Sequence, residues 1–243
     1  MSDLFSPWTL GEVTFRNRIF VAPMCQYSSA DGHPTDWHFV HLGSRAVGGA
    51  GLVMIEASAV TPAGRITPAD LGLWQDAHIA EFKRNADFIH AQGAAVGVQL
   101  AHAGRKASCD APWRGGKALS AEQGGWQTVA PSAIAFSDGS STPHALTHAE
   151  IVELVDAFAA AAERALAESM AARQNAIAEA VQTRRYEPAL EQVAMLAEPL
   201  DAFFDQVMVM VDDPALRDNR LALLQALDGL CRQVVDVSRL ALD

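Results

Sequence analysis

The stretch GLVMIEASAV, residues 51–60, is a run dominated by apolar side chains. A short apolar run of this kind, bounded by turn residues, is typical of a strand buried on both faces. Two similar runs flank it in the sequence, RIFVAPM at residues 18–24 and AAVGVQLAHAG at residues 94–104. The first is ended by Pro23, which has no backbone N–H to donate within a sheet. We therefore predict three buried strands.

The segments between and after these strands have helical patterns. Residues 35–49 begin with a threonine and an aspartate and end in two glycines, and residues 76–93 form an amphipathic pattern closed by a glycine. A third helix is predicted over residues 147–168, where Thr147 and Glu150 have the spacing of a capping box. Strands that alternate with helices in this way predict a parallel sheet with right-handed crossovers.

Two other regions complete this part of the chain. Residues 8–16 are predicted to form a hairpin around Gly11. Residues 105–146 form a long loop rich in Gly, Pro, Ser and Trp, and loops of this length in a compact domain are usually functional. The side chains able to take part in binding or catalysis lie at the predicted strand ends, in APMCQY, EASAV and QLAHAGRK. In α/β folds these ends form the functional face.

The character of the chain changes after Ser169. The last 75 residues contain no His, Trp or Lys, and short helical patterns replace the strand signals, followed by a longer one over residues 214–242. Its heptad-like apolar spacing favours the core face of a helical bundle over a coiled coil. We expect two modules, residues 1–168 and residues 169–243. Residues 163–174, ERALAESMAARQ, have high helix propensity throughout, which predicts one continuous helix or two with an ordinary break.

Composition narrows the classes of function. The 243 residues carry a net charge of −11 and a sequence pI of about 5.1, which argues against a general binder of nucleic acid or membrane surfaces. The three cysteines, Cys25, Cys109 and Cys231, form no CxxC pair and indicate neither a zinc site nor a disulfide framework. The sequence shows no signal peptide and no long apolar span, so a cytoplasmic protein is expected.

Residues 1–168 resemble the N-terminal part of the old yellow enzyme family, in its cysteine-containing bacterial subgroup. The resemblance lies in the stretches RNRIFVAPMCQYSSADG, GLVMIEASAVTPAGRITP, GVQLAHAGRKA and WQTVAPSAIAF. Members of this family are ene-reductases that hold FMN in a TIM barrel. The resemblance implies an α/β region followed by an all-α region: a partial (β/α)8 TIM barrel of three βα units with an N-terminal hairpin, then a small helical bundle fragment.

The resemblance also implies a set of cofactor-binding residues. Gln99 would hold the polar edge of the FMN ring with Ala57 near it, because an amide offers both a donor and an acceptor. The backbone of Pro23 and Met24 would pack beside the ring. Cys25 would lie near the reactive nitrogen and tune the potential of the flavin through a soft S–H contact.

Two residues are implied in catalysis, Cys25 and Tyr27, the latter facing the substrate. Without the resemblance, Cys25 is more simply a small buried apolar residue, and Gln99 a polar residue that faces a loop. His38 and His41 are three residues apart on a predicted helix, but no further ligands at fitting spacing accompany them, so no metal site is expected.

Arg105 and Lys106 form the remaining candidate site. The pair would suit a phosphate, although a solvated pair of loop charges is the simpler interpretation.

The resemblance to old yellow enzymes ends within the chain. Three of the family's eight βα units are present, and no later segment matches the strand that carries the family's substrate-binding His-and-His or His-and-Asn pair, or its glycine-rich phosphate site. Residues 171–240 instead resemble the C-terminal end of the bacterial glycyl-tRNA synthetase β subunit, part of its anticodon-binding domain. This second resemblance lies in YEPALEQVAMLAEPLDAFFDQVMVMVDDPALRDNRLALLQAL.

Three functions are open on this basis. The first is FMN-dependent reduction of an activated alkene by NAD(P)H. The second is tRNA binding, against which the C-terminal part carries seven arginines and twelve acidic residues. The third, which we favour, is an incomplete oxidoreductase module joined to a synthetase-like fragment, without native catalytic activity and with weak or no FMN binding. Three strands leave open sheet edges, so self-association is also expected.

Overall fold

The computed structural model describes residues 3–11, 13–183, 193–194, 220–222, 224–229 and 231. The chain divides into two compact units. The first comprises Met1–Trp8 and Phe15–Arg164, and the second comprises Thr9–Thr14 and Ala165–Asp243.

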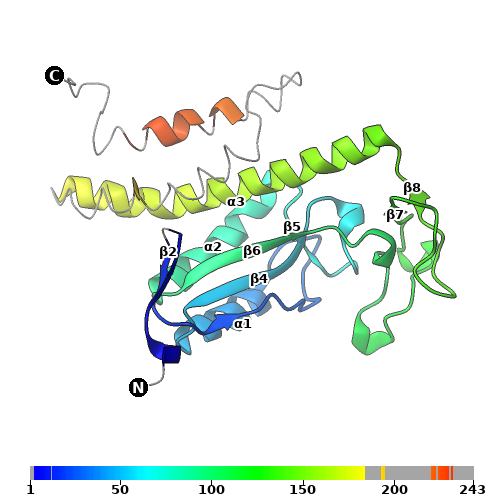
Figure 1. Ribbon diagram of the computed structural model, residues 1–243, viewed down its shortest axis with the longest axis horizontal. Helices are drawn as coiled ribbons and strands as arrows, with labels where there is room; N and C mark the ends of the chain where they lie inside the picture. Colours follow the sequence, from blue (N-terminus) through cyan, green and yellow to red (C-terminus); the bar gives the residue numbers. More distant parts are fainter. Residues whose placement is uncertain are drawn as a thin grey trace. The chain divides into compact units, whose positions relative to one another are not determined.

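The first unit is built on a four-stranded parallel sheet whose central strand is β4 (Leu52–Ala59). β6 (Ala95–Ala101) pairs with β4 along its whole length, and the two strands lie side by side in Figure 1. β3 (Phe20–Val21) pairs with the beginning of β4, and β5 (Leu71–Gly72) with its end. The three predicted parallel strands are confirmed. β5 was not predicted, because two residues are too few to show a periodic pattern.

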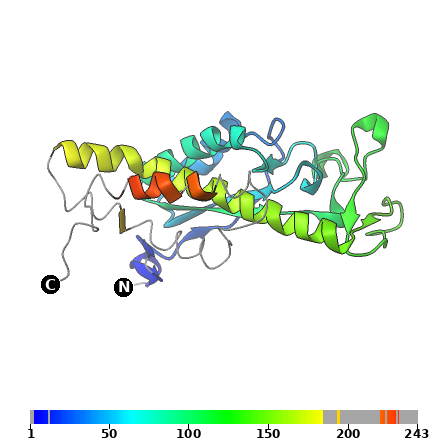
Figure 2. The same ribbon diagram turned by 90° about the horizontal axis from the view of Figure 1, so that it is seen from above.

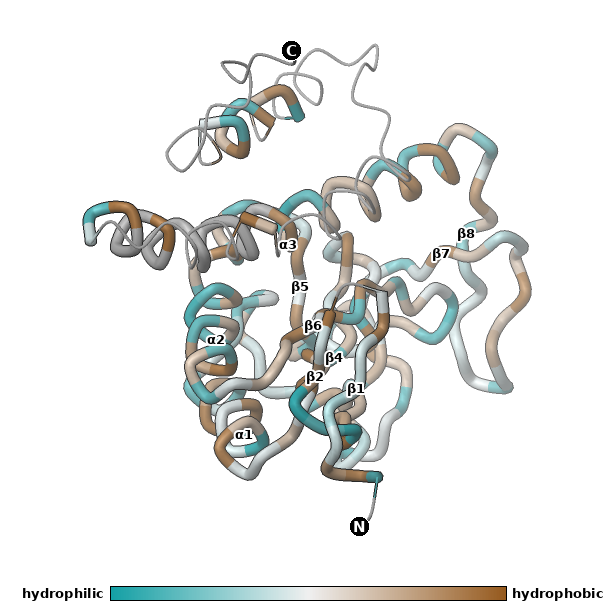
Figure 3. Tube along the Cα trace, turned by 60° about the vertical axis from the view of Figure 1, so that its left-hand side comes forward, coloured by the Kyte–Doolittle hydropathy of each residue, from teal (hydrophilic) through white to brown (hydrophobic). Residues whose placement is uncertain are grey.

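Two helices pack against each other on one face of this sheet, α1 (Asp36–Val47) and α2 (Ile79–Ala91) (Figure 2). In Figure 3, α2 alternates between hydrophilic and hydrophobic colours, as its amphipathic sequence predicts. The two helices approach closely at Gly43, where a Cβ atom would lie 2.8 Å from the ring of Phe88. Glycine at this position therefore sets the distance between the helices.

Burial differs between the central strand and its neighbours. Val53 and Ile55 of β4 are 0% and 3% exposed, whereas β6 is largely half-buried and Phe20 of β3 is 39% exposed. β4 is thus the most buried of the three strands, although Leu52, Met54 and Ala57 are only half-buried, and the prediction of buried strands does not hold for β3 and β6. The strand predicted over residues 18–24 also shortens to two residues, because the chain leaves the sheet before Pro23.

The region after β6 is mostly irregular, as predicted. It contains one feature that the sequence did not indicate, a parallel pair formed by β7 (Val129–Ala130) and β8 (His144–Ala145). Short 3₁₀ helices occur here and earlier in the chain: Asp3–Phe5, Pro62–Gly64, Asp76–His78, Gly104–Lys106, Pro112–Arg114 and Ala121–Gln123.

α3 is a single helix over His148–Gln182. Its first turn has the predicted capping box, in which the Glu150 carboxylate accepts from the Thr147 amide at 2.7 Å and the Thr147 hydroxyl accepts from the Glu150 amide at 3.3 Å. The prediction of a helix across residues 163–174 is confirmed. The helical pattern of residues 171–186 continues the helix predicted over residues 147–168 as far as Gln182, because no glycine or proline separates the two.

The predicted hairpin is formed by β1 (Trp8–Leu10) and β2 (Val13–Phe15), and its inner part, Thr9–Thr14, belongs to the second unit. Gly11 between them has φ 58°, a conformation that favours glycine. Of the helix predicted over residues 187–197, only residues 193–194 are described, and they are helical. The helix predicted over residues 198–209 and most of the one over residues 214–242 lie outside the described residues. Of the latter, residues 220–222, 224–229 and 231 are helical. No helix in the described part of the chain is long and apolar enough to span a membrane.

The first prediction concerns the core of the first unit. Phe82 on α2 is fully buried, so Phe82→Ala should lower the free energy of unfolding by about 3–5 kcal/mol through lost burial and a residual cavity. The same change at Phe5, which is 68% exposed, should cost less than about 1 kcal/mol. Urea unfolding followed by circular dichroism measures both. Equal losses for the two variants would contradict the proposed core.

Candidate functional site

The predicted cofactor residues come from three neighbouring strand ends. Pro23, Met24 and Cys25 follow β3, while Ala57 of β4 and Gln99 of β6 are direct partners in the parallel register. Parallel pairing brings the carboxyl ends of neighbouring strands to the same edge of the sheet. Residues more than 70 positions apart in the sequence thus share one surface.

A β-bulge interrupts the pairing of β4 and β6 within this group. Ile55 pairs with Val98 and Ala57 pairs with Gln99, so Glu56 is an extra residue without a partner on β6. Bulges re-aim side chains and are common beside functional sites. Here Ile55 and Glu56 are consecutive and both buried, which strict alternation along a strand would not allow.

The two predicted catalytic side chains lie together. The Cys25 thiol interacts with the backbone at Ala57 and with the hydroxyl of Tyr27. Burial, reinforced by the negative charges of Asp70 and Glu56, raises the pKa of Cys25 to about 11. Burial, followed by the effect of Cys25, also raises the pKa of Tyr27. Both groups are therefore protonated at neutral pH, and the cysteine offers a neutral S–H rather than a thiolate.

The backbone at Tyr27 has an unusual conformation. Its φ is 48°, in the left-handed region that residues other than glycine seldom adopt. The ring makes an edge contact with Trp113, with centroids 5.6 Å apart. Such strain persists only where surrounding contacts hold it, and it occurs often at binding sites.

Two members of the predicted group are accessible. Met24 is 47% exposed, and Gln99 is also exposed. The side chain of Gln99 forms no hydrogen bond with any residue that the structure describes. An amide with free donors and a free acceptor at this edge is able to bind a polar ligand edge.

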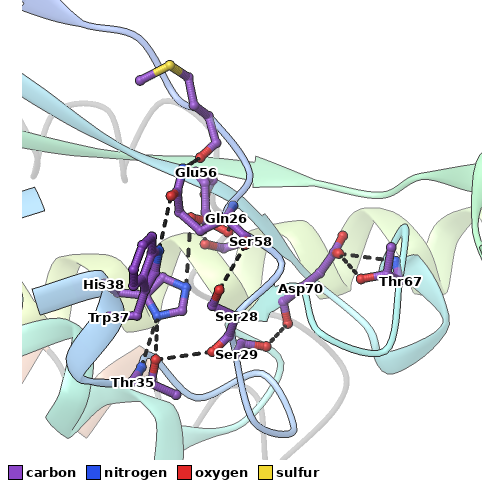
Figure 4. A network of polar contacts seen from close by, with 11 residues as sticks. Gln26, Ser28, Ser29, Thr35, Trp37, His38, Glu56, Ser58, Thr67 and Asp70 are labelled. Atoms are coloured by element: carbon purple, nitrogen blue, oxygen red, sulfur yellow. Dashed lines mark hydrogen bonds and ion pairs between the residues drawn. The ribbon is translucent and has the colours of Figure 1, made fainter. Parts of the chain in front are cut away.

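A network of hydrogen bonds fixes the loop that carries Cys25 and Tyr27 (Figure 4). The Gln26 amide donates to Glu56 Oε1 at 2.9 Å, and Gln26 Nε2 donates to the Met24 carbonyl at 2.7 Å. Trp37 Nε1 donates to Gln26 Oε1 at 3.1 Å. Further along the loop, Ser28 Oγ donates to the Gln26 carbonyl at 2.9 Å. The loop is thus fastened both to β4 and to the first turn of α1.

Asp70 fixes the loop from another direction. Its carboxylate accepts from the Thr67 hydroxyl at 2.7 Å and from the backbone amides of Ile66 and Thr67 at 2.7 and 3.1 Å. The hydroxyl of Ser29 donates to the Asp70 carbonyl. Burial raises the pKa of Asp70, while these hydrogen bonds and Arg65 oppose the shift.

Glu56 and His38 are the most deeply buried ionisable residues of the network. Glu56 is 2% exposed and His38 is fully buried, and Glu56 Oε2 lies 3.8 Å from His38 Nε2. Burial raises the pKa of Glu56 to about 7. Burial, followed by the charge of His41, lowers the pKa of His38 to about 4. Each shift favours the uncharged form.

Sequence reasoning missed Glu56, Gln26 and Asp70, and considered His38 only as a metal ligand. A charged residue inside the apolar run at residues 51–60 was the signal available for Glu56. His38 Nδ1 accepts from the Thr35 amide at 3.0 Å, which directs that nitrogen to the start of its own helix. The described residues contain no cluster of three or more His, Cys, Asp or Glu able to hold a metal ion.

Arg105 and Lys106 do not join the group at the strand ends through any interaction found among the described residues. Both side chains are exposed and lie over the ring of Phe136, at 5.9 and 4.7 Å from its centroid.

Residues 3–171 match the model of the NADH:flavin oxidoreductase / NADH oxidase family. The chain belongs to this family. Residues 140–237 match the DALR anticodon binding domain, so the C-terminal part has the character of an anticodon-binding domain, as its sequence suggested. The two matches overlap within α3 and the residues before it.

Relatives of this chain support the family assignment. The chain is 52% identical over 169 residues to an NADH:flavin oxidoreductase of Gibberella zeae, covering 68% of this chain and 41% of that protein. It is 47% identical over 167 residues to an NADPH dehydrogenase of Listeria monocytogenes, covering 68% of this chain and 45% of the relative. The chain thus spans less than half the length of these relatives.

Solved structures agree with this fold assignment. Morphinone reductase in complex with tetrahydroNAD matches with a TM-score of 0.57 and 32% identity, covering 69% of this chain and 47% of that one. An old yellow enzyme homologue from Zymomonas mobilis matches with a TM-score of 0.56 and 29% identity, covering 69% and 46%. The first part of this chain therefore has the fold of part of an old yellow enzyme.

The second prediction concerns stability and pH. Between pH 4.5, the ordinary pKa of the carboxyl, and about pH 7, folded Glu56 retains a proton that the unfolded chain has lost. Stability should therefore fall as pH rises through this window, by up to about 1.4 kcal/mol per pH unit. Glu56→Gln has no such proton, so its stability relative to wild type should increase from pH 4.5 to pH 7.

His38 acts in the opposite direction. Its pKa falls from 6.5 to about 4 on folding, so its contribution to stability is lost as pH falls through this range. Glu56→Gln should therefore show stability that rises with pH up to 6.5. Urea midpoints measured across this range test both effects, with Glu153→Gln, at an exposed position on α3, as the matched control. Parallel profiles for wild type and Glu56→Gln would show that Glu56 does not have a raised pKa.

Proposed function

We propose that the surface formed by Pro23, Met24, Cys25, Ala57 and Gln99 binds the ring of FMN, as part of an NAD(P)H-dependent oxidoreductase. The observation that carries the proposal is the register pair Ala57–Gln99 beside the loop that begins at Pro23. When bound, FMN accepts and donates hydride. The old yellow enzyme likeness makes reduction of an activated alkene the reaction class that we favour.

The residues present fit an FMN ring. Gln99 offers an exposed amide that no described residue occupies, which suits the polar edge of the ring. Pro23 and Met24 offer partly exposed apolar surface for its face. Cys25 presents a neutral S–H, because burial raises the pKa of its thiol to about 11, and such a group makes a soft contact without adding negative charge.

Each side chain has a defined task in this proposal. Gln99 orients the ring, Cys25 contacts it, and Tyr27 faces the substrate. The strained backbone at Tyr27 supports a functional role for this side chain.

We further propose that these 243 residues bind FMN weakly and do not turn over alone. No segment after residue 171 resembles the later family units that bring the substrate-binding His pair and the phosphate site. We place the boundary between the partial barrel and the helical module at residues 168 and 169, close to the end of the family match at residue 171.

Binding of tRNA is a second candidate, favoured by the match of residues 140–237 to an anticodon-binding domain. Attraction to phosphate is the main source of affinity for nucleic acids. Residues 169–243 carry seven arginines against twelve acidic residues, so this attraction is poor. We therefore rank tRNA binding below the flavin site.

Self-association is part of the same proposal. α1 exposes three large apolar side chains, Trp37, Val40 and Val47, which are 57%, 65% and 64% exposed. Their spacing of three and seven residues places them along one face of the helix. Apolar stripes of this kind often mark interaction surfaces, and a second copy of the chain is the partner expected here.

The third prediction tests the flavin surface. FMN added to the protein should not survive a desalting column, because the phosphate contacts of the family's later strands are missing. Fluorescence titration should still detect weak binding, and Gln99→Ala should weaken it about tenfold by removing hydrogen bonds to the ring edge. Gln92→Ala, before the opposite end of β6, is the control and should bind as wild type does. If Gln99→Ala binds FMN with the affinity of wild type, this surface is not the binding site. If FMN stays bound through desalting, the proposal of weak binding is wrong, and catalysis by these residues alone becomes the favoured hypothesis.

The fourth prediction tests self-association. Sedimentation velocity should show larger species as concentration rises, with binding of the dye ANS. The double variant Val40→Lys, Val47→Lys should shift the distribution towards monomer, because two charges on this face oppose apolar association. A wild-type monomer at every concentration, with cooperative unfolding and no ANS binding, would contradict the proposal.

A further inference from the structure

The buried Glu56 carboxyl makes contacts that the flavin proposal does not explain. Its Oε1 accepts from the Gln26 amide at 2.9 Å, and Gln26 lies between Cys25 and Tyr27. The Cys25 thiol interacts with the backbone at Ala57, the residue after Glu56. The carboxyl is thus joined on one side to the loop that presents the thiol, and on the other to the strand that the thiol contacts.

The opposite oxygen of Glu56 faces an imidazole whose tautomer the structure indicates. His38 Nδ1 accepts from the Thr35 amide at 3.0 Å, so in the neutral ring the proton lies on Nε2. That N–H points towards Glu56 Oε2 but remains 3.8 Å away, and Nε2 has no hydrogen-bond partner among the described residues. His38 and Glu56 point towards one another in Figure 4. The pair is close enough to interact electrostatically but forms no ordinary hydrogen bond.

The other ionisable groups that act on Glu56 or respond to it carry negative charge or acquire it on ionisation. Asp70, on the loop before β5, raises the pKa of Glu56, and burial is the larger cause. Glu56 in turn raises the pKa of both Cys25 and Tyr27. Because the pKa of His38 is lowered to about 4, its imidazole is neutral near pH 7, and no buried cation of this network offsets an ionised Glu56.

We propose that Glu56 is a positioning residue whose carboxyl holds the Cys25–Tyr27 loop against β4 and whose charge governs the reactivity of the Cys25 thiol. Protonated Glu56 leaves the thiol free to ionise more readily, and ionised Glu56 opposes a second negative charge beside it. The carboxyl loses its proton at about pH 7, so the thiol changes its reactivity near neutral pH. The inference rests on the proposed function only in placing Cys25 at a flavin.

The experiment measures thiol alkylation in protein without flavin. Cys109→Ser and Cys231→Ser leave Cys25 as the single thiol of the chain. The rate of reaction with iodoacetamide is followed from about pH 5 to about pH 10, because the thiolate is the reacting form. The logarithm of the rate should rise with pH, with a shallower segment near pH 7 where Glu56 ionises.

Glu56→Gln is the decisive variant, because it keeps an oxygen that accepts from the Gln26 amide and removes the charge. Its profile should lose the shallow segment. Above pH 7, removal of the Glu56 charge should lower the pKa of the Cys25 thiol by about one unit, which raises the thiolate fraction about tenfold. A thiolate of lower pKa is a weaker nucleophile, so alkylation of Glu56→Gln should be only about threefold faster than that of wild type. The control Glu153→Gln, at an exposed position on α3, should keep the wild-type profile.

Several outcomes would overturn the proposal. A natively folded Glu56→Gln protein, judged by circular dichroism, whose profile coincides with wild type would do so. So would a uniform increase in rate with the shallow segment intact, since that indicates only a loosened loop. If Glu56→Gln does not fold, the wild-type profile decides, and a line of unbroken slope through pH 7 refutes the coupling. Failure of FMN to bind would leave all these profiles unchanged, so the two proposals fail separately.

Discussion

The arrangement of the candidate site depends on how one buried carboxyl is accommodated. The bulge in β4 places Glu56 inside the protein at 2% exposure, and a carboxyl buried there needs either a proton or hydrogen-bond donors. It receives one donor from the Gln26 amide and remains close to neutral His38. The loop with Cys25 and Tyr27 is therefore positioned by polar contacts rather than by apolar packing alone.

The parallel sheet explains why the site is both ordered and open. β4 lies between neighbours on both sides and is buried, so it provides a rigid base for Ala57. β3 and β6 lie at the margins of the described sheet and are only partly covered, which leaves Met24 and Gln99 accessible. A closed barrel would continue the sheet past both margins. The surface proposed to bind FMN is accessible for this reason.

Two family matches meet within the single helix α3. The flavin oxidoreductase match ends at residue 171, and the anticodon-binding match begins at residue 140. Helix propensity is high on both sides of the junction, so the backbone continues as a helix although the flanking sequences resemble different families. Local helix formation depends on nearby residues, which is why a join of this kind leaves no break in secondary structure.

The sequence alone determined the three βα units and the capping of α3 by Thr147 and Glu150, because periodic patterns and capping motifs are local. The proximity of Ala57 and Gln99 was expected only from the resemblance to the old yellow enzyme family, and the parallel register of β4 and β6 accounts for it. The sequence did not determine β5 or the pair β7–β8, whose two-residue strands form only through partners elsewhere in the chain. Nor did it indicate the role of Glu56. A bulge depends on the register between two strands. Only the tertiary structure shows that this register directs the Glu56 carboxyl towards His38 and the Cys25 loop.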